Sequence, residues 1–250
     1  MSQTSINLAE YLRVKELNPV TELENKIAEY FGAPHAVAVD CCTHGIELCL
    51  IRNKATKMEV PTQTYISIPF LARKLGLHIT WSEAYWLDYY FLTKDIVDAA
   101  VLWKPNSYIP KTFMCLSFQF QKHLSLGRGG MILTDNEEAA EELKLMSHDG
   151  RHPDVPWREQ DISTMGYHYY MTPETGRLGL AKFEEAKDKK PKQWTTADWP
   201  DLRKMSVFND GGWICKHCGK STFNTEYDYL VDKDEHLSCA FNKQLENEKK

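Results

Sequence analysis

Three polar groups in the sequence each come directly after a short apolar segment: Asp98, Ser117 with Lys122, and Cys42 with Thr43. The first offers a carboxylate, the second a hydroxyl and an amine, and the third a hydroxyl beside the N–H groups of an expected helix start, which favours an anion. An amine, an acid and a phosphate-binding turn are what pyridoxal phosphate needs from a protein. The amine forms the Schiff base, the acid keeps the pyridine nitrogen protonated and the turn anchors the phosphate.

The segments that carry these groups alternate with helical patterns along the chain. Short apolar runs predict strands at residues 36–39, 58–60, 78–81, 96–97, 113–116 and 131–133. Helical patterns lie at residues 21–31, 42–50, 66–75, 136–147 and from residue 173 onward. This alternation predicts an α/β fold whose mostly parallel sheet has helices on both faces. Ligands of such sheets bind outside the carboxyl ends of the strands, where the three polar groups are expected.

Two helix starts have a recognisable capping pattern. Thr21 and Glu24 have the spacing of a capping box, and Leu23, Ile27 and Phe31 would form the apolar face of the helix that follows. Near the end of the α/β part, residue 172 is a threonine and residue 173 a proline, which predicts an N-cap and a first helical position. The two patterns fix where the first and last helices of this part are expected to begin.

The motifs also occur in the order typical of one enzyme family. The chain resembles the DegT/DnrJ/EryC1/StrS sugar aminotransferases, which are fold-type I pyridoxal-phosphate enzymes. The resemblance spans roughly residues 20–190 and is carried by five segments: residues 31–43, 61–65, 98–100, 117–130 and 165–171. It implies a cytoplasmic homodimer with a shared active site that transfers an amino group, from glutamate in most relatives, to a keto group of a nucleotide-linked sugar.

The resemblance also implies a role for each matching residue. Lys122 would be the Schiff-base lysine and the general base, and Asp98 the partner of the pyridine nitrogen. Tyr65 would stack on the cofactor ring, and Cys42, Thr43 and Ser117 would hold the phosphate. His168 would also contact the cofactor, from the neighbouring subunit. Lys122 and Asp98 are therefore the predicted catalytic residues.

Several positions depart from the family pattern. Val101 stands where the family usually has Gln or His, His168 replaces an Asn and Tyr170 replaces an Arg. The stretch from residue 81 to 96 is shorter than in the family, and the small domain that normally follows the last helix is not recognisable. These departures leave a second hypothesis open, in which a catalytically degenerate aminotransferase scaffold acts as a binding or assembly module through its tail.

Composition limits the other classes of function. The chain has 250 residues, 42% of them hydrophobic and 26% charged, which predicts a folded α/β domain over residues 1–188, a linker over 189–210 and a small module over 211–250. A net charge of -5 argues against a general polyanion-binding surface. No leader pattern or long apolar run is present, so membrane spanning and secretion are not expected. Seven scattered cysteines favour a reducing cytoplasm over a disulfide scaffold.

The tail has a pattern of its own. Cys215 and Cys218 form a C-x-x-C pair, and His236 and Cys239 follow after a loop of about 17 residues, a spacing that lets four ligands surround one zinc ion. His217 is an alternative to His236 as a ligand. The loop between the pairs is rich in Asp and Glu and would repel phosphate, so nucleic acid is not an expected partner. The sequence therefore predicts a structural or partner-docking zinc knuckle.

Overall fold

The chain divides into two compact units in a computed structural model that describes residues 18–153, 155–209, 230–232 and 235–236. The first unit consists of Met1–Arg52 and Asp95–Gln193, and the second of Asn53–Lys94 and Trp194–Lys250. Three of the predicted zinc ligands, Cys215, Cys218 and Cys239, lie outside the described residues, as does His217. His236 is described only as part of a strand. The zinc knuckle and the predicted domain boundaries therefore remain predictions.

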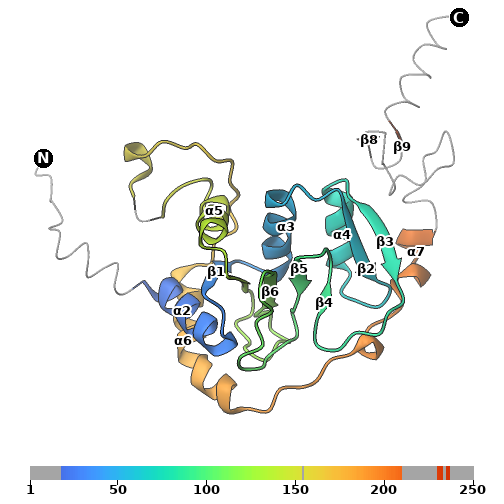
Figure 1. The fold of residues 1–250 in the computed structure, drawn as a ribbon, viewed down its shortest axis with the longest axis horizontal. Coiled ribbons are helices and arrows are strands. Elements are labelled where there is room, and N and C mark those ends of the chain that lie inside the picture. Colours follow the sequence, from blue (N-terminus) through green and yellow to red (C-terminus); the bar gives the residue numbers. More distant parts are fainter. Residues whose placement is uncertain (1–17, 154, 210–229, 233–234, 237–250) are drawn as a thin grey trace, which may run out of the picture. The chain divides into compact units, whose positions relative to one another are not determined.

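A mixed sheet forms the centre of the first unit (Figure 1). Its strands are β1 (His35–Val39), β5 (Ile96–Asp98), β6 (Phe113–Ser117) and β7 (Gly130–Thr134), in the order β1-β7-β6-β5. β5 and β6 run parallel, whereas β7 runs antiparallel to both β1 and β6. The predicted α/β fold is confirmed, but the sheet of this unit is mixed rather than mostly parallel.

The connection between β6 and β7 explains why β7 runs antiparallel to β6. The Phe118 N–H donates to the Gly129 carbonyl at 2.9 Å, and the Leu126 N–H donates to the Phe118 carbonyl at 2.9 Å. This connection therefore folds back on itself and extends the β6–β7 pairing. A parallel return would need a crossover, usually a helix, and the connection contains none.

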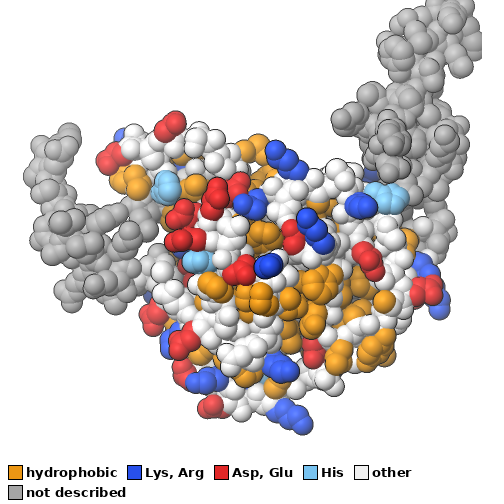
Figure 2. Space-filling model, in the orientation of Figure 1, with side chains coloured by type: hydrophobic (Ala, Val, Ile, Leu, Met, Phe, Trp, Pro, Cys, Tyr) orange, Lys and Arg blue, Asp and Glu red, His pale blue; other side chains and the backbone are white. Residues whose placement is uncertain are grey.

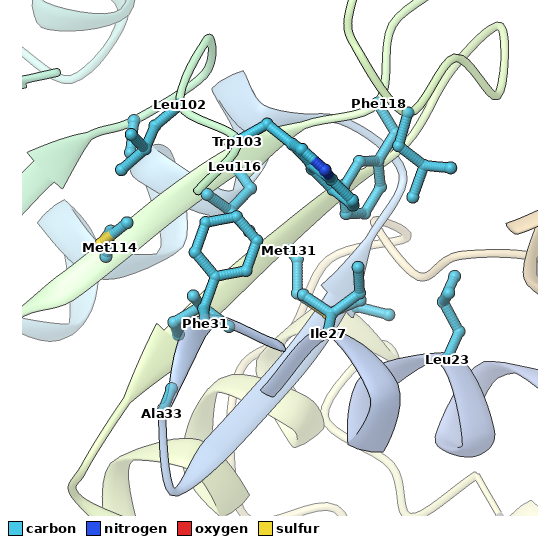
Figure 3. Close-up of a cluster of buried hydrophobic side chains, with 14 of the residues drawn as sticks. Leu23, Ile27, Phe31, Ala33, Leu102, Trp103, Met114, Leu116, Phe118 and Met131 are labelled. Atoms are coloured by element: carbon cyan, nitrogen blue, oxygen red, sulfur yellow. The ribbon is translucent and has the colours of Figure 1, made fainter. Parts of the chain in front are cut away.

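Helices cover both faces of this sheet (Figure 1). α2 (Pro19–Phe31) and α6 (Pro173–Asp188) pack in a core cluster that includes Met131 and Leu133, alternate residues of β7. Figure 3 shows the part of this cluster in which Leu23, Ile27 and Phe31 of α2 lie near Met131. α3 (Cys42–Arg52) packs on the opposite face, where Gly45 lies against Ile132. α5 (Glu137–Ser147) contacts β1, β7 and α3. The single-turn helix η1 (Trp157–Glu159) follows α5 in the same unit.

Two glycines allow the close packing of α2 against α6. A Cβ on Gly179 would lie 2.5 Å from Cδ2 of Leu23, and one on Gly176 would lie 3.0 Å from the backbone of Pro19. Leu23, Ile27 and Phe31 are fully buried, as their spacing predicts. Their burial is the main hydrophobic contribution of α2 to the first unit.

The start of α2 differs from the predicted capping box. The side chain of Asn18 caps this helix by accepting a hydrogen bond from the Val20 N–H, and Pro19 is the first helical residue. Glu24 faces inward instead, is 5% exposed, accepts a hydrogen bond from the Ala38 N–H and pairs with Lys144. The capping-box prediction is wrong because Asn followed by Pro is a stronger start three residues earlier. At α6, Thr172 caps the helix as predicted.

The second unit is built on a strand–helix–strand motif. β2 (Lys57–Pro61) and β3 (His78–Ser82) are parallel and joined by α4 (Ser67–Lys74). The remaining elements of this unit are β4 (Tyr90–Phe91), η2 (Thr196–Asp198), η3 (Leu202–Lys204), α7 (Ser206–Asn209), β8 (Leu230–Asp232) and β9 (Glu235–His236). The described core of this unit includes Val60, Ile68, Leu71, Ala72 and Leu202.

The described surface mixes charges of both signs. In Figure 2, basic and acidic side chains alternate among hydrophobic and uncharged polar ones and do not form one basic patch on this face. None of the helices that the structure describes has the length and apolar composition needed to cross a bilayer.

Candidate functional site

The topology of the first unit brings three strand ends to one edge of the sheet. Because β7 is antiparallel to both β1 and β6, and β5 is parallel to β6, the strands β1, β5 and β6 all point the same way. Asp98 ends β5, Ser117 ends β6, and α3 begins with Cys42 shortly after β1. The predicted catalytic and phosphate-binding residues of this unit therefore come from one edge, as expected for an α/β fold.

Asp98, Lys122 and Cys42 are close enough to influence one another's charge. Asp98 is 4% exposed, and its Oδ1 accepts a hydrogen bond from the Ala100 N–H at 3.0 Å. Lys122 lies in the turn after β6, where its N–H donates to the Gln119 carbonyl at 2.8 Å. The negative charge of Asp98 favours the charged form of Lys122 and disfavours a Cys42 thiolate. An amine and a carboxylate that are distant in sequence thus lie close enough in the first unit to interact electrostatically.

Burial controls the protonation of this group. It lowers the pKa of Lys122 despite the opposing charge of Asp98. Burial and the charge of Asp98 raise the pKa of the Cys42 thiol well above its usual value. The amine of Lys122 is therefore uncharged in a larger fraction of molecules than a surface lysine, while Cys42 remains a neutral thiol.

The predicted phosphate turn forms the first turn of α3. Cys42 is the first residue of this helix and Thr43 the second, and Thr43 is half-buried. A Cβ on Gly130 would lie 2.5 Å from the Cys42 nitrogen and 2.6 Å from the Cys41 carbonyl carbon, so only glycine permits this contact. Gly130 is also the register partner of Ser117, whose hydroxyl accepts a hydrogen bond from the Gln119 N–H at 3.4 Å. The β6–β7 connection thus buttresses the helix N-terminus, where backbone N–H groups favour an anion.

A cluster of charged residues that the sequence analysis did not predict lies beside this turn. Asp40 Oδ1 is 2.6 Å from His44 Nδ1, and Asp40 Oδ2 accepts a hydrogen bond from Arg128 Nη2 at 2.6 Å. The ring of His44 stacks on Tyr169, with the centroids 3.7 Å apart. The signal available in the sequence was a carboxylate directly after a strand with a histidine four residues later. Arg128 is too distant in sequence for that spacing to reveal it.

Within this cluster, hydrogen-bonded and charged partners change the pKa values of Asp40 and His44 more than burial does. Burial alone would raise the pKa of Asp40, but hydrogen bonds and charge from His44 and Arg128 hold it below the usual value. Burial alone would lower the pKa of His44, but hydrogen bonds with Asp40 and Cys41 and the electrostatic effect of both groups raise it to about 9. His44 is therefore a cation at neutral pH, beside the predicted phosphate turn.

The same cluster contains a geometric candidate for a metal site. Asp40, Cys41 and His44 each offer one ligand atom, all within 4.8 Å of one another. Arg128 pairs with Asp40, and His44 carries a positive charge, so the surroundings oppose a metal cation. All four cysteines that the structure describes are free, and Cys42, Cys49 and Cys115 are buried.

Two further predicted cofactor contacts, Tyr65 and His168, belong to different units of the chain. Tyr65 belongs to the second unit, where its side chain is 53% exposed and meets Trp199 edge to face. His168 is in the first unit, has a side chain that is 72% exposed, and is hydrogen-bonded to Asp149 and Tyr170. The roles assigned to both residues stay predictions.

The residues gathered at the sheet edge fit a cofactor that has an aldehyde, a basic ring nitrogen and a phosphate. A half-buried amine is available for the aldehyde, a buried carboxylate for a protonated ring nitrogen, and a helix N-terminus for the phosphate. The glycine contact at residue 130 lets the β6–β7 connection approach the helix start closely enough to shape that cradle.

Comparison with known proteins agrees with this arrangement. The sequence profile of the DegT/DnrJ/EryC1/StrS aminotransferase family matches residues 10–85 and 110–198, which together make up more than half of the chain. A curated relative, an uncharacterized protein of Methanocaldococcus jannaschii, is 33% identical over 78 residues. That match covers 28% of this chain and only 20% of the relative.

Solved structures share the fold at low sequence identity. AtS13 from Actinomadura melliaura has a TM-score of 0.62 at 19% identity, with 75% of this chain and 67% of that chain covered. The sugar aminotransferase CalS13 from Micromonospora echinospora has a TM-score of 0.55 at 16% identity, with 74% and 67% covered. The protein named "Putative sugar aminotransferase Spr1654" from Streptococcus pneumoniae, in its PLP form, has a TM-score of 0.55 at 17% identity, with 74% and 65% covered.

Proposed function

Because the chain belongs to the DegT/DnrJ/EryC1/StrS aminotransferase family, we propose that it is a pyridoxal-phosphate-dependent aminotransferase. The observation that carries the proposal is the convergence of Lys122, Asp98 and Cys42 at one edge of the sheet in the first unit. When bound, pyridoxal phosphate supplies an aldehyde that takes up an amino group and a ring that withdraws electrons from the carbon that loses its proton.

Lys122 and Asp98 would perform the acid–base work. Burial lowers the pKa of Lys122, so its side chain is more often the uncharged amine that can bond to an aldehyde or accept a proton. Asp98 is buried, and its carboxylate would hold a proton on the ring nitrogen by opposite charge. The Asp98 hydrogen bond to the Ala100 N–H fixes the carboxylate at the end of β5.

The start of α3 would hold the phosphate. Cys42 and Thr43 contribute backbone N–H groups of the first helical turn, and Thr43 and Ser117 add hydroxyls. The positive end of the helix dipole and the cationic His44 both favour a dianion there. The Asp40 carboxylate has the opposite effect, but Arg128 and His44 both neutralise it.

The finer parts of the proposal concern substrates and assembly. We propose glutamate as the amino donor and a keto group of a nucleotide-linked sugar as the acceptor; two of the structural neighbours are named as sugar aminotransferases. We also propose a cytoplasmic homodimer, with Tyr65 and His168 contributing to cofactor binding as the family resemblance implies. For the tail we propose a zinc ion on Cys215, Cys218, His236 and Cys239, which metal analysis of the purified full-length chain can test.

An absorption spectrum of the full-length chain with pyridoxal phosphate tests the catalytic proposal. We expect a visible band from the covalently attached cofactor, absent in Lys122→Ala and present in the matched control Lys104→Ala, which removes an exposed lysine of the same unit. After borohydride reduction, peptide mass spectrometry should find the cofactor on Lys122. Added glutamate should bleach the band, and a keto-sugar nucleotide should then restore it with formation of an amino sugar.

Three outcomes would contradict the proposal. They are a wild-type chain that stays colourless at saturating cofactor, a band that survives in Lys122→Ala, and reduction that labels a different lysine. A colourless wild-type chain that still binds zinc would favour the alternative of a degenerate scaffold that works through its tail.

A further inference from the structure

Two aromatic residues that follow the predicted catalytic residues in sequence contact each other. Trp103 comes five positions after Asp98, and His123 comes directly after Lys122. The ring centroids of Trp103 and His123 lie 5.5 Å apart, with an interplanar angle of 33°. The segment that carries the carboxylate therefore touches the segment that carries the amine, through side chains that the proposed reaction does not use.

Trp103 is held in the core of the first unit. It is 5% exposed and stacks on Tyr30 of α2, with the centroids 4.9 Å apart and an interplanar angle of 27°. It also meets Phe31 of α2 edge to face at 5.7 Å, and Phe183 of α6 at 6.2 Å and 67°. Trp103 and Phe31 belong to the buried cluster drawn in Figure 3. Because aromatic pairs have preferred geometries, these rings leave Trp103 little freedom to move.

A short turn joins Trp103 to Asp98. The Leu102 N–H donates to the Ala99 carbonyl at 3.0 Å, and the Ala99 N–H donates to the Cys115 carbonyl of β6 at 2.9 Å. These hydrogen bonds fix the backbone between the carboxylate and the indole. Because the turn starts at the end of β5, a displacement of the indole would also displace the carboxylate.

His123 links the turn after β6 to α6. Its Nε2 lies 2.7 Å from the Ala186 carbonyl, and because a carbonyl only accepts, Nε2 is the donor. Ala186 is 5% exposed, so water has little access to this acceptor. A second hydrogen bond joins the same two elements, from Lys182 Nζ to the Ser125 carbonyl at 2.8 Å, but it is exposed. The hydrogen bond of His123 is therefore the better shielded of the two and the stronger constraint on the turn.

The surroundings of the Lys122 amine depend on where this turn lies. Burial lowers the pKa of Lys122, and the charge of Asp98 acts in the opposite direction. Both influences change if the turn moves relative to the end of β5, and so does the reach of the amine toward an aldehyde. A misplacement of about 1 Å can reduce a reaction rate by about a hundredfold.

We propose that His123 and Trp103 are positioning residues, whose ring contact holds the Lys122 amine at a fixed place relative to the Asp98 carboxylate. The helices α2 and α6 supply the rigid frame, through the stacking of Trp103 on α2 and the hydrogen bond of His123 to α6. The inference rests on the proposed function, because it gives these residues a part in attaching the cofactor to Lys122. Its expected effect falls on the amine and not on the phosphate-binding start of α3.

Stopped-flow absorbance of the full-length chain mixed with increasing concentrations of pyridoxal phosphate separates these two effects. The concentration dependence of band formation gives an apparent dissociation constant, which reports mainly on phosphate binding, and a limiting rate, which reports on the amine. We expect His123→Leu to lower the limiting rate about tenfold and to leave the dissociation constant within about twofold of wild type. His123→Gln keeps an N–H donor for the Ala186 carbonyl, so its limiting rate should recover to within about threefold of wild type.

Two further variants test the contact itself. Trp103→Phe keeps an aromatic ring but reduces the contact with His123, and should lower the limiting rate about fivefold. In the double variant with His123→Leu the two losses should not multiply, because both substitutions weaken the same contact. The matched control Lys182→Gln removes the exposed hydrogen bond between the same turn and α6, and should leave both quantities within about twofold.

Equal limiting rates in wild type, His123→Leu and Trp103→Phe would overturn the inference. So would parallel losses in limiting rate and affinity, which indicate a general loss of structure, or a Lys182→Gln variant as slow as His123→Leu. A wild-type chain that forms no band contradicts the proposed function, and the inference is then rejected with it. A normal wild-type band with unaffected variants contradicts the inference alone.

Discussion

Burial and acidic neighbours have opposite effects on the pKa of a basic side chain, and a different one prevails at Lys122 than at His44. Lys122 has acidic neighbours, yet burial prevails and lowers its pKa. His44 also has acidic neighbours, but there the partners prevail over burial, and its pKa rises to about 9. One region therefore favours an uncharged base and the other maintains a cation, although both lie in the first unit near the start of α3.

This difference follows from how the partners are arranged. Asp98 acts on Lys122 through its charge in a buried setting, and desolvation of the amine has the larger effect. Asp40 instead makes a direct 2.6 Å contact with His44, and Arg128 holds the carboxylate in place from its other oxygen. The short charge-assisted contact between Asp40 and His44 offsets the cost of burial there, whereas the charge of Asp98 does not offset it at Lys122.

The largest expected effect comes from removing the buried charge. Asp98→Asn keeps an oxygen for the Ala100 N–H and changes little in volume, so it tests charge alone. We expect the rate of the half-reaction with glutamate to fall about a hundredfold or more, as when other preorganised electrostatic contacts are lost. Stopped-flow absorbance measures this rate.

The same substitution should also lower the pKa of Lys122 further, because the charge of Asp98 opposes the effect of burial. The pH profile of the half-reaction should therefore shift toward lower pH. An unchanged rate and an unchanged pH profile would show that the Asp98 carboxylate does not act on the Lys122 amine. Lys122 could then no longer be compared with His44 as a base whose acidic neighbour is outweighed by burial.

A smaller effect is expected from the contact that supports the phosphate turn. Gly130→Ala would place a Cβ 2.5 Å from the Cys42 nitrogen, so either β7 or the start of α3 must move. We expect a loss of about 2 to 3 kcal/mol in the free energy of unfolding, together with weaker cofactor binding. Urea unfolding and a cofactor titration measure the two effects.

Gly127→Ala is the matched control in the same connection. Gly127 has a φ of 82°, but a Cβ there meets nothing within 4 Å, so only backbone strain of about 1 kcal/mol is expected. If the two variants lose the same stability and bind the cofactor equally well, the close contact at residue 130 does not shape the turn.

Local sequence patterns predicted the buried region well. Strands were expected at residues 36–39, 96–97, 113–116 and 131–133, and each lies within an observed strand of the first unit. The polar residues that follow β1, β5 and β6 lie at one edge of the sheet because these three strands run in the same direction. The positions of these strands and of the polar residues at their ends can therefore be predicted from apolar runs and the residues that follow them.

The charged cluster was not predictable in the same way. Arg128 reaches Asp40 across 88 residues, and the contact depends on the β6–β7 connection folding back, which no periodicity reports. The antiparallel direction of β7 was missed for the same reason. Glu24 shows the limit of local patterns, because its spacing fitted a cap while its actual partners, Ala38 and Lys144, come from elsewhere in the chain.

The smallest effect concerns His44 and the pH dependence of stability. Its pKa rises from 6.5 in the unfolded chain to about 9 in the folded one, so folding favours the protonated form. The resulting stabilisation is fully present below about pH 6.5 and is lost as the pH rises through about 9. With allowance for solvent screening of a side chain that is 23% exposed, we expect a loss of about 1 to 2 kcal/mol between these limits.

His44→Phe isolates this contribution because it keeps an aromatic ring against Tyr169 but removes the titrating group. Urea unfolding at pH 6.5 and pH 9 should show that the difference in stability between wild type and variant shrinks as the pH rises. Asp40→Asn should flatten the pH dependence in the same way, because the carboxylate is the main partner of the histidine. A constant difference between wild type and His44→Phe at both pH values would mean that direct contact does not outweigh burial here, and the two regions would then obey the same rule.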